Sequence, residues 1–458
     1  MDERPNWCYC RGMMKRQKTP TAGLISLGCP KNTVDSERML AELAVAGFTI
    51  GADLASADVV VVNTCGFIEP ARQEAIETIR EVVGYKSTGP VQRVLVAGCL
   101  AQRLGERLLE EVEGIDAVVG LAQRDRIGRI AIDVLSGCEQ RSYLGSCPQD
   151  CADDSGRVLT TSGHWAYLRI SEGCSHKCSY CTIPAIRGPF RSKRPEQVLR
   201  EARELADSGV VEVNVIAQDT TQYGSDIGLK GGLIGIIAGL EQIDRLAWVR
   251  LMYLWPVGIT GELIDTIARS EKCAHYLDIP IQHADDAILK AMRRPDNASR
   301  LRALIERLRA AMPDIILRTT VIVGFPGETD AQFERLLDFV RWARFDALGC
   351  FAYCREQGTP AAALEGQIPE QVKNERVERL MLAQQEIAFD KNASLVGSRL
   401  VCLVDRVEED GVRIGRYYGQ APEIDSICIV EGCLARPGQF VTVKVTGSRG
   451  YDLLARAT

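Results

Sequence analysis

The chain has 458 residues, enough for about three domains of ordinary size. Its apolar fraction of 46% and charged fraction of 25% are typical of globular proteins, which excludes a disordered, collagen-like or coiled-coil chain. A formal net charge of -6 excludes a global basic field that would attract nucleic acid or an anionic membrane. Seventeen cysteines without a signal-peptide pattern predict reduced thiols in the cytoplasm, some of them used for metal or redox chemistry. No apolar run approaches the roughly 20 residues of a membrane-spanning helix, so we expect no membrane partner.

The first twenty residues mix acidic and basic side chains with Cys8 and Cys10 and show no apolar periodicity. We expect residues 1–20 to form a flexible leader in which these two cysteines have no function.

Residues 21–135 alternate apolar runs with amphipathic stretches. Strand candidates at 22–29, 57–65 and 91–99 are separated by stretches with helical character. Continuous apolar runs between helices predict a parallel sheet that is covered on both faces. The sequence therefore predicts an N-terminal α/β domain, followed by a linker at 136–163 that is rich in Ser, Gly and Asp.

Six strand-like segments recur between residues 164 and 394, and each is followed by room for a helix. They lie at 165–170, 211–218, 247–254, 276–281, 315–325 and 345–353. This alternation predicts a central β/α barrel, either partial or complete, with an amphipathic helix at 369–392 on its flank. Residues 395–458 contain short strand candidates with Gly turns, which predict a small all-β barrel.

The strongest chemical signal is a C-x3-C-x2-C run, in which Cys174, Cys178 and Cys181 follow the first barrel strand. Three thiolates on one loop can hold three corners of a cubane iron-sulfur cluster and leave the fourth iron open to a ligand. A structural zinc site is the alternative, because His176 could serve as a fourth ligand.

A second triad is spread along the N-terminal domain. Cys29, Cys65 and Cys99 each follow one of three successive strand candidates. Because the carboxyl ends of parallel strands meet at one edge of a sheet, we expect these thiols to converge there as a second cluster site. The alternative is that three small buried thiols pack as hydrophobic side chains.

Further motifs accompany the triads: GCPKN at 28–32, NTCGF at 63–67, GCLAQ at 98–102, YLDIPIQH at 276–283 and VGFPGE at 323–328. With these motifs the chain resembles the methylthiotransferase family of radical S-adenosylmethionine (SAM) enzymes, from about residue 22 to residue 457. The resemblance implies an N-terminal cluster domain, a radical SAM β/α barrel and a terminal TRAM barrel.

The resemblance also implies two 4Fe-4S clusters and S-adenosylmethionine as cofactors. In that family the barrel cluster cleaves S-adenosylmethionine to a radical, and the second cluster carries the sulfur that is transferred. The implied cluster ligands are Cys29, Cys65, Cys99, Cys174, Cys178 and Cys181. The implied contacts to S-adenosylmethionine are Tyr180, Gln218, Gln282 and Gly324.

Some members of the family modify an adenosine in transfer RNA, and one branch modifies an aspartate β-carbon in a small-subunit ribosomal protein. GCPKN at 28–32 with VDSE at 34–37, and RYYGQAPEID at 416–425, resemble the ribosomal branch, although Ser426 stands where that branch usually has Gly. The implied partners are the ribosomal protein and an external electron donor. A transfer-RNA methylthiotransferase and a non-catalytic iron-sulfur protein are the alternatives.

The terminal barrel is electrically balanced, since residues 396–458 contain eight basic and eight acidic side chains. A barrel that follows RNA phosphates would normally be basic. We therefore expect it to dock the basic ribosomal protein through acids such as Glu423 and Asp425, with contact to the ribosome or its RNA as the alternative role of a TRAM domain.

Two further groups of side chains do not belong to these motifs. The basic residues between 187 and 194 fit either a solvated surface or a site that orients an anion. His164, His275 and His283 lack the spacing of metal ligands, so we expect them in the core or at the surface.

Overall fold

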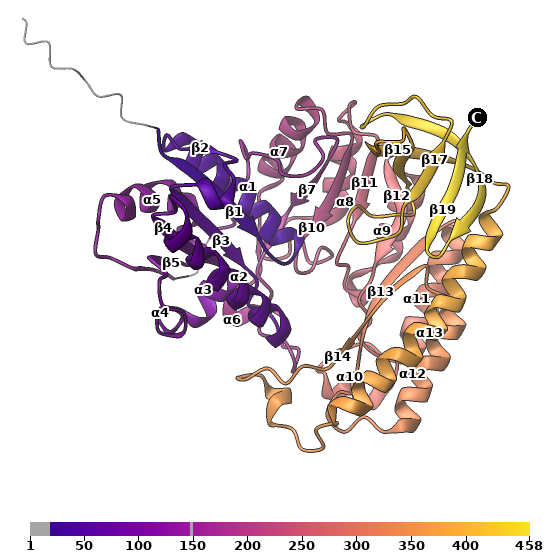
Figure 1. The fold of residues 1–458 in the computed structure, drawn as a ribbon. Coiled ribbons are helices and arrows are strands. Elements are labelled where there is room, and N and C mark those ends of the chain that lie inside the picture. The colour runs from indigo at the N-terminus through magenta and orange to yellow at the C-terminus, as the bar shows by residue number, and fades with distance from the viewer. Residues whose placement is uncertain (1–18, 147–149) are drawn as a thin grey trace, which may run out of the picture.

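The computed structural model describes residues 19–146 and 150–458, so Cys8 and Cys10 lie outside the described residues. In Figure 1 the N-terminal domain and the terminal barrel lie on either side of a central parallel sheet. This arrangement confirms the predicted order of an α/β domain, a β/α sheet domain and a small all-β barrel. Within the described ranges, no helix is long and apolar enough to span a membrane.

The N-terminal sheet is parallel throughout, with the strand order β2-β1-β3-β4-β5-β6. Its strands are β1 (Thr21–Ser26), β2 (Thr49–Ile50), β3 (Val59–Thr64), β4 (Arg93–Gly98), β5 (Ala117–Val119) and β6 (Ser142–Tyr143). The helical segments are α1 (Pro30–Val45), η1 (Leu54–Ser56), α2 (Glu69–Thr88), α3 (Cys99–Leu104), α4 (Arg107–Glu111), η2 (Leu121–Arg126) and α5 (Ile127–Leu135). Separate apolar cores cover the two faces, which explains why β3 is buried along its whole length.

Strand β6 was not expected, because it lies within the polar segment 136–163 that predicts a linker. It pairs with β5 and extends the N-terminal sheet beyond Leu135. The sequence pattern for this strand is weak because the strand has only two residues, and both are half-buried. The division into domains at 21–135, 136–163, 164–394 and 395–458 stays a prediction.

The central sheet is also parallel and follows the order β14-β13-β12-β11-β10-β7, so it is an open, partial barrel. Its strands are β7 (Trp165–Arg169), β10 (Glu212–Ile216), β11 (Trp248–Leu251), β12 (Cys273–Asp278), β13 (Ile316–Val323) and β14 (Ala347–Ala352). A short antiparallel pair, β8 (Ser171–Glu172) and β9 (Arg191–Ser192), flanks the loop after β7. The six predicted segments therefore correspond to the strands of this sheet.

The helical segments of the central domain cover its outer face or connect its strands. They are α6 (Ile183–Arg187), α7 (Pro195–Asp207), α8 (Gly232–Glu241), η3 (Pro256–Gly258), α9 (Gly261–Arg269), α10 (Asp286–Ala291), α11 (Ala298–Ala311), α12 (Asp330–Ala343), η4 (Pro360–Ala363) and α13 (Glu370–Leu395). In Figure 1, α13 runs beside α12 and leads to the terminal barrel, as the amphipathic pattern at 369–392 predicts.

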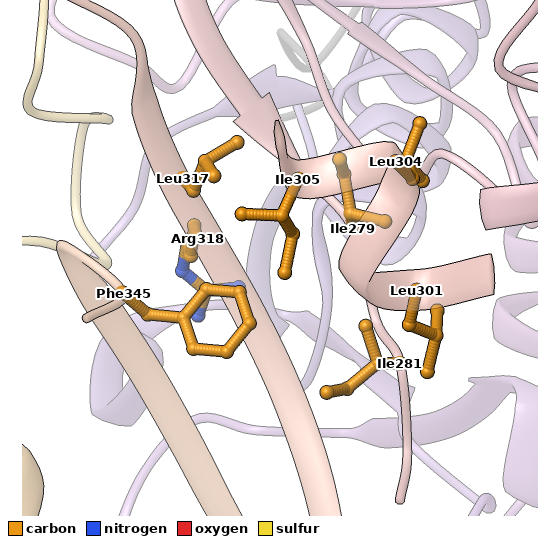
Figure 2. Close-up of a pocket in the computed structure, with 8 residues that line it drawn as sticks. All are labelled: Ile279, Ile281, Leu301, Leu304, Ile305, Leu317, Arg318 and Phe345. Carbon is orange, nitrogen blue, oxygen red and sulfur yellow. The ribbon is translucent and has the colours of Figure 1, made fainter. Parts of the chain in front are cut away.

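The two faces of the central sheet have different chemistry. Val213 and Val215 of β10 face the large apolar core beneath the helices, whereas Glu212 and Asn214 alternate with them and face inward. Figure 2 shows a pocket on the helix-covered side, between β13 and α11, with a cavity volume of about 10 Å³. It is a packing gap too small for a cofactor, whereas the inner face of the sheet carries polar side chains such as Glu212 and Asn214.

The terminal barrel is closed, in the order β15-β16-β17-β19-β18. Its strands are β15 (Arg399–Val407), β16 (Arg413–Tyr417), β17 (Cys428–Glu431), β18 (Phe440–Arg449) and β19 (Asp452–Ala457). Arg416 joins it to the central sheet: its guanidinium lies 2.7 Å from Glu212 and 2.8 Å from Asp405, and the residue is only 2% exposed.

One prediction for this barrel is wrong. The carboxylate of Asp425 accepts a hydrogen bond of 2.7 Å from the Tyr276 hydroxyl and lies 3.5 Å from Arg318. Because both partners belong to the central sheet, Asp425 anchors the barrel to that sheet and is not available to dock a ribosomal protein. Glu423 remains exposed, with a long contact of 3.4 Å from the Tyr167 hydroxyl.

We predict that Arg416→Met lowers the free energy of unfolding by about 3 kcal/mol, because Glu212 and Asp405 each lose a buried partner. Urea denaturation measures the change. Arg436→Met is the matched control on the exposed surface and should change stability by less than about 0.5 kcal/mol. Equal stability of the two variants would contradict the role of Arg416 as an anchor.

Candidate active site

The three N-terminal cysteines meet at the carboxyl edge of their sheet, as the sequence predicts. Cys29 is the N-cap of α1, Cys65 follows β3, and Cys99 begins α3 directly after β4. Gly28 has a φ of +99°, and a Cβ atom there would lie 2.8 Å from the Cβ of Cys65, so only glycine permits this approach. Burial raises the pKa of the Cys99 thiol to about 12, against the opposing effect of the nearby Arg187 guanidinium.

Asn32 holds the loops of this triad together. Its side-chain amide donates hydrogen bonds to the carbonyls of Leu27 at 2.8 Å and Thr64 at 2.9 Å. Its backbone carbonyl accepts from the Asn63 side chain at 2.9 Å. One buried amide thus connects the segments that carry Cys29 and Cys65.

The barrel triad occupies the loop between β8 and α6. Gly173 has a φ of +76°, and a Cβ atom there would collide with the carbonyl of Pro189. The backbone N–H of Ile183 donates to the Cys181 sulfur at 3.4 Å. Burial raises the pKa of the Cys174 thiol to about 11 and that of Cys181 to about 12, so ligation must remove a proton from each.

His176 does not support the zinc alternative. Its Nε2 lies 2.6 Å from Asp219, and its ring stacks on Trp255 with centroids 3.8 Å apart and an interplanar angle of 10°. Both interactions hold the imidazole away from a role as fourth ligand beside the three cysteines.

The donor sets fit iron-sulfur clusters better than a single ion. Among the described residues, no group of three His, Cys, Asp or Glu side chains is arranged around one metal ion. In a cubane each thiolate ligates a different iron, so the sulfurs surround the cluster and need not converge on one point. Each triad consists of thiols alone, the soft donors that iron-sulfur clusters prefer.

The four predicted contacts to S-adenosylmethionine lie along the same edge of the central sheet. Gln218 follows β10, Gln282 follows β12, Gly324 follows β13, and Tyr180 lies on the cysteine loop. The side-chain oxygens of Gln218 and Gln282 are buried and lack a hydrogen-bond partner in the described part of the chain. Their oxygens are thus free for a ligand, and contact with S-adenosylmethionine stays a prediction for all four residues.

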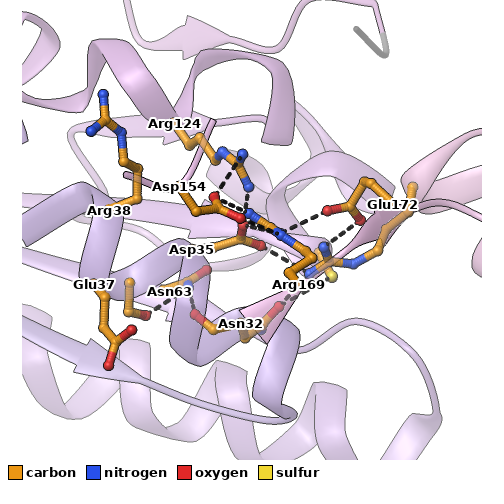
Figure 3. A network of polar contacts seen from close by, with 12 residues as sticks. Asn32, Asp35, Glu37, Arg38, Asn63, Arg124, Asp154, Arg169 and Glu172 are labelled. Atoms are coloured by element: carbon orange, nitrogen blue, oxygen red, sulfur yellow. Dashed lines mark hydrogen bonds and ion pairs between the residues drawn. The ribbon is translucent and has the colours of Figure 1, made fainter. Parts of the chain in front are cut away.

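A buried ionic network joins the two cysteine-bearing domains (Figure 3). Arg169 at the end of β7 lies 2.7 Å from Asp35 of α1, 2.5 Å from Asp154 of the linker segment and 2.7 Å from Glu172. Arg187 at the end of α6 lies 2.7 Å from Glu172 and 3.0 Å from Asp35. These contacts fix the N-terminal sheet against the cysteine loop.

Two members of the basic run after the cysteine loop, Arg187 and Lys193, fit neither interpretation. Arg187 belongs to the network above, and the Lys193 amine lies 2.7 Å from Asp154 and 2.6 Å from Glu201. Arg187 and Lys193 are 3% and 1% exposed, so they are neither solvated nor free to orient an anion. Arg194 is exposed.

The two triads belong to one site. Thr182, next to Cys181, donates a hydrogen bond from its hydroxyl to the carbonyl of Phe67 at 3.3 Å, and Phe67 is two residues beyond Cys65. The Arg187 guanidinium donates to the Asn32 side chain at 2.6 Å. An open parallel sheet with one cysteine triad at its carboxyl edge, facing a second triad, defines a radical SAM enzyme with an auxiliary cluster.

Comparison with known proteins supports this class. Three family models match: the Uncharacterized protein family UPF0004 over residues 21–120, the Radical SAM superfamily over 168–340 and the TRAM domain over 396–458. The methyltransferase TsrM of Kitasatospora setae, 14% identical, superimposes with a TM-score of 0.55 over 87% of this chain and 81% of its own. At that identity the likeness concerns the fold alone.

Curated relatives define the family more narrowly. Ribosomal protein uS12 methylthiotransferase RimO of Pelotomaculum thermopropionicum is 46% identical, over 94% of this chain and 98% of its own. The protein of the same name from Symbiobacterium thermophilum is 45% identical, over 95% of this chain and 90% of its own. The chain belongs to the RimO family of ribosomal protein methylthiotransferases, which confirms the family resemblance seen in the sequence.

Lys31 and Tyr253 also lie at this site and were missed in the sequence. The Lys31 amine is 2.9 Å from the centroid of the Tyr253 ring. Lys31 stands inside the GCPKN motif, two residues after the predicted ligand Cys29. That position could have indicated from the sequence alone that Lys31 lies at the site. Tyr253 has a φ of +60°, which no sequence pattern reveals.

We predict about eight iron atoms per chain after anaerobic reconstitution, the sum of two four-iron clusters. Replacing Cys174, Cys178 and Cys181 by Ala should leave about four, because the N-terminal triad is built by other segments. Iron analysis measures the loss, and exposed Cys138→Ala should change nothing. Full iron content in the triple variant would refute the assignment of the barrel ligands.

Proposed function

We propose that this protein transfers a methylthio group to the β-carbon of an aspartate in ribosomal protein uS12. The supporting observation is the pair of cysteine triads joined in one site, in a chain that is 46% identical to a protein named ribosomal protein uS12 methylthiotransferase. No observation favours a transfer-RNA substrate, and a non-catalytic iron-sulfur protein would not need the second triad at the mouth of a radical SAM sheet.

Six cysteines would hold the cofactors, with Cys174, Cys178 and Cys181 at one cluster and Cys29, Cys65 and Cys99 at the other. When bound, the barrel cluster supplies the electron that cleaves S-adenosylmethionine, and the second cluster supplies a place for the sulfur to be transferred. The protein must then keep the reacting atoms dry and close together. Tyr167 and Tyr276, both almost fully buried, close the inner face of the sheet against water.

The partners follow from this reaction. The substrate is uS12, an external reductant supplies the electron, and the cytoplasm is where a ribosomal protein is met. Because Asp425 is bound to the central sheet, contact of the terminal barrel with the ribosome falls to its remaining surface, which includes the exposed acid Glu423. The balanced charge of the barrel gives it no particular attraction for RNA phosphates.

We predict that the two triads separate by role. Replacing Cys29, Cys65 and Cys99 by Ala should spare formation of 5'-deoxyadenosine, because S-adenosylmethionine is cleaved at the other triad, whose three cysteines lie on a separate loop. Transfer of the methylthio group should stop. Mass spectrometry of uS12 and chromatography of the nucleoside measure the two outcomes in one reaction, and undiminished methylthio product from the variant would refute the role of the second triad.

A substrate comparison tests the function itself. Purified enzyme offered uS12 and bulk transfer RNA in separate reactions should modify only the protein. Modification of transfer RNA in preference to uS12 would overturn the proposal in favour of the transfer-RNA branch.

A further inference from the structure

Lys31 carries a buried amine for which the described residues provide no hydrogen-bond acceptor. It lies in the first turn of α1, and the residue is 5% exposed. Its Nζ lies over the face of the Tyr253 ring, 2.9 Å from the centroid. Within residues 19–146 and 150–458 no hydrogen bond from this Nζ is found. A buried ammonium group with unused donors is costly, so the site favours an added acceptor.

The acids near Lys31 are bound by other groups. Glu172 and Asp278 are close enough for their charges to act on the amine. Glu172, however, accepts hydrogen bonds from Arg187 and Arg169, each at 2.7 Å. Asp278 accepts from Arg318 at 2.9 Å and from the Tyr253 backbone at 3.1 Å. Among the described residues of this site, neither acid forms an ion pair with Lys31. Burial lowers the pKa of the amine to about 7, and the charge that most opposes this shift is that of Cys29. An added carboxylate would favour the ammonium form.

The amine lies at the carboxyl edge of the central sheet. Tyr253 follows β11, and Asp278 ends β12, so both belong to the carboxyl edge of the central sheet that also carries Gln282. Lys31 itself belongs to the N-terminal domain, two residues after Cys29. It thus reaches from one triad toward the strand ends beside the other. An ammonium group against an aromatic face, with its donors free, is suited to one carboxylate.

We propose that Lys31 Nζ binds the side-chain carboxylate of the substrate aspartate. This inference rests on the proposed function and names the contact that selects the substrate residue. The carboxylate carbon is bonded to the β-carbon, so holding the carboxylate also fixes the carbon that reacts. The Tyr253 ring packs against the amine and helps to hold it in place.

The test compares two substrates in two enzymes, each reconstituted anaerobically. The wild-type enzyme should bind uS12 about tenfold more tightly than uS12 in which the modified aspartate is replaced by asparagine, as one charge-assisted hydrogen bond allows. In Lys31→Met this preference should vanish, while Lys31→Arg should retain part of it. Such a double-mutant cycle isolates the contact between the lysine and the carboxylate.

Exposed Lys230→Met is the matched control and should keep the tenfold preference. Iron content of each variant reports whether its clusters are assembled. Equal weakening of both substrates by Lys31→Met would mean that Lys31 supports the fold or the neighbouring cluster, and would overturn the inference. An equal loss of affinity for S-adenosylmethionine would overturn it too, by assigning the amine to that carboxylate.

The measurements distinguish failure of this inference from failure of the proposed function. If the wild-type enzyme neither binds nor modifies uS12, the proposed function is refuted. If the wild-type enzyme modifies uS12 and the preference for aspartate persists in Lys31→Met, only the inferred role of Lys31 is refuted.

Discussion

The ionic network around Arg169 is the constraint on which the site depends. Arg169 is completely buried and is held by Asp35, Asp154 and Glu172, which come from three separate segments of the chain. Charges removed from water in this way are stable only when every partner is present, and loss of one partner typically costs about 3–5 kcal/mol. The network is therefore a poor source of net stability but a strict means of fixing geometry. It fixes the position of one cysteine triad relative to the other, although the two triads lie on separate parts of the chain, at residues 29–99 and 174–181.

Arg187 extends this constraint to the triads themselves. It binds Glu172 and Asp35 in the network, and it also binds Asn32, which holds the loops of Cys29 and Cys65. Its position at the end of α6 is only six residues beyond Cys181. A shift of the cysteine loop would therefore be transmitted directly to the N-terminal triad. The short helix α6 therefore links the cysteine loop to the N-terminal triad: its last residue, Arg187, bonds to Glu172, Asp35 and Asn32.

Local patterns predicted most of the fold and both triads, because apolar runs identify parallel strands and the residues directly after such strands lie at one edge of the sheet. The same patterns could not predict contacts between distant segments. In the sequence Asp425 is an acid on a Gly-poor turn, and only the packing of Tyr276 and Arg318 against it shows that it is an anchor. Arg169 did give a signal, since it is a charge in an otherwise apolar strand, but its three partners come from sequence positions up to 134 residues away.

Backbone strain marks the part of the site that the sequence conceals. Tyr253 and Gln282 have φ values of +60° and +68°, a region that costs a residue with a side chain about 1–3 kcal/mol. Each follows a strand of the central sheet, β11 or β12, and each is held there by backbone hydrogen bonds to its neighbours. The strained turns direct one ring against Lys31 and leave one amide oxygen without a partner in the described part of the chain. Positive φ alone does not mark a site, since Arg293, Arg344 and Glu423 share it. What sets Tyr253 and Gln282 apart is that both strained turns lie at adjacent strand ends and present side-chain groups at one edge of the central sheet, a placement typical of strain kept for function.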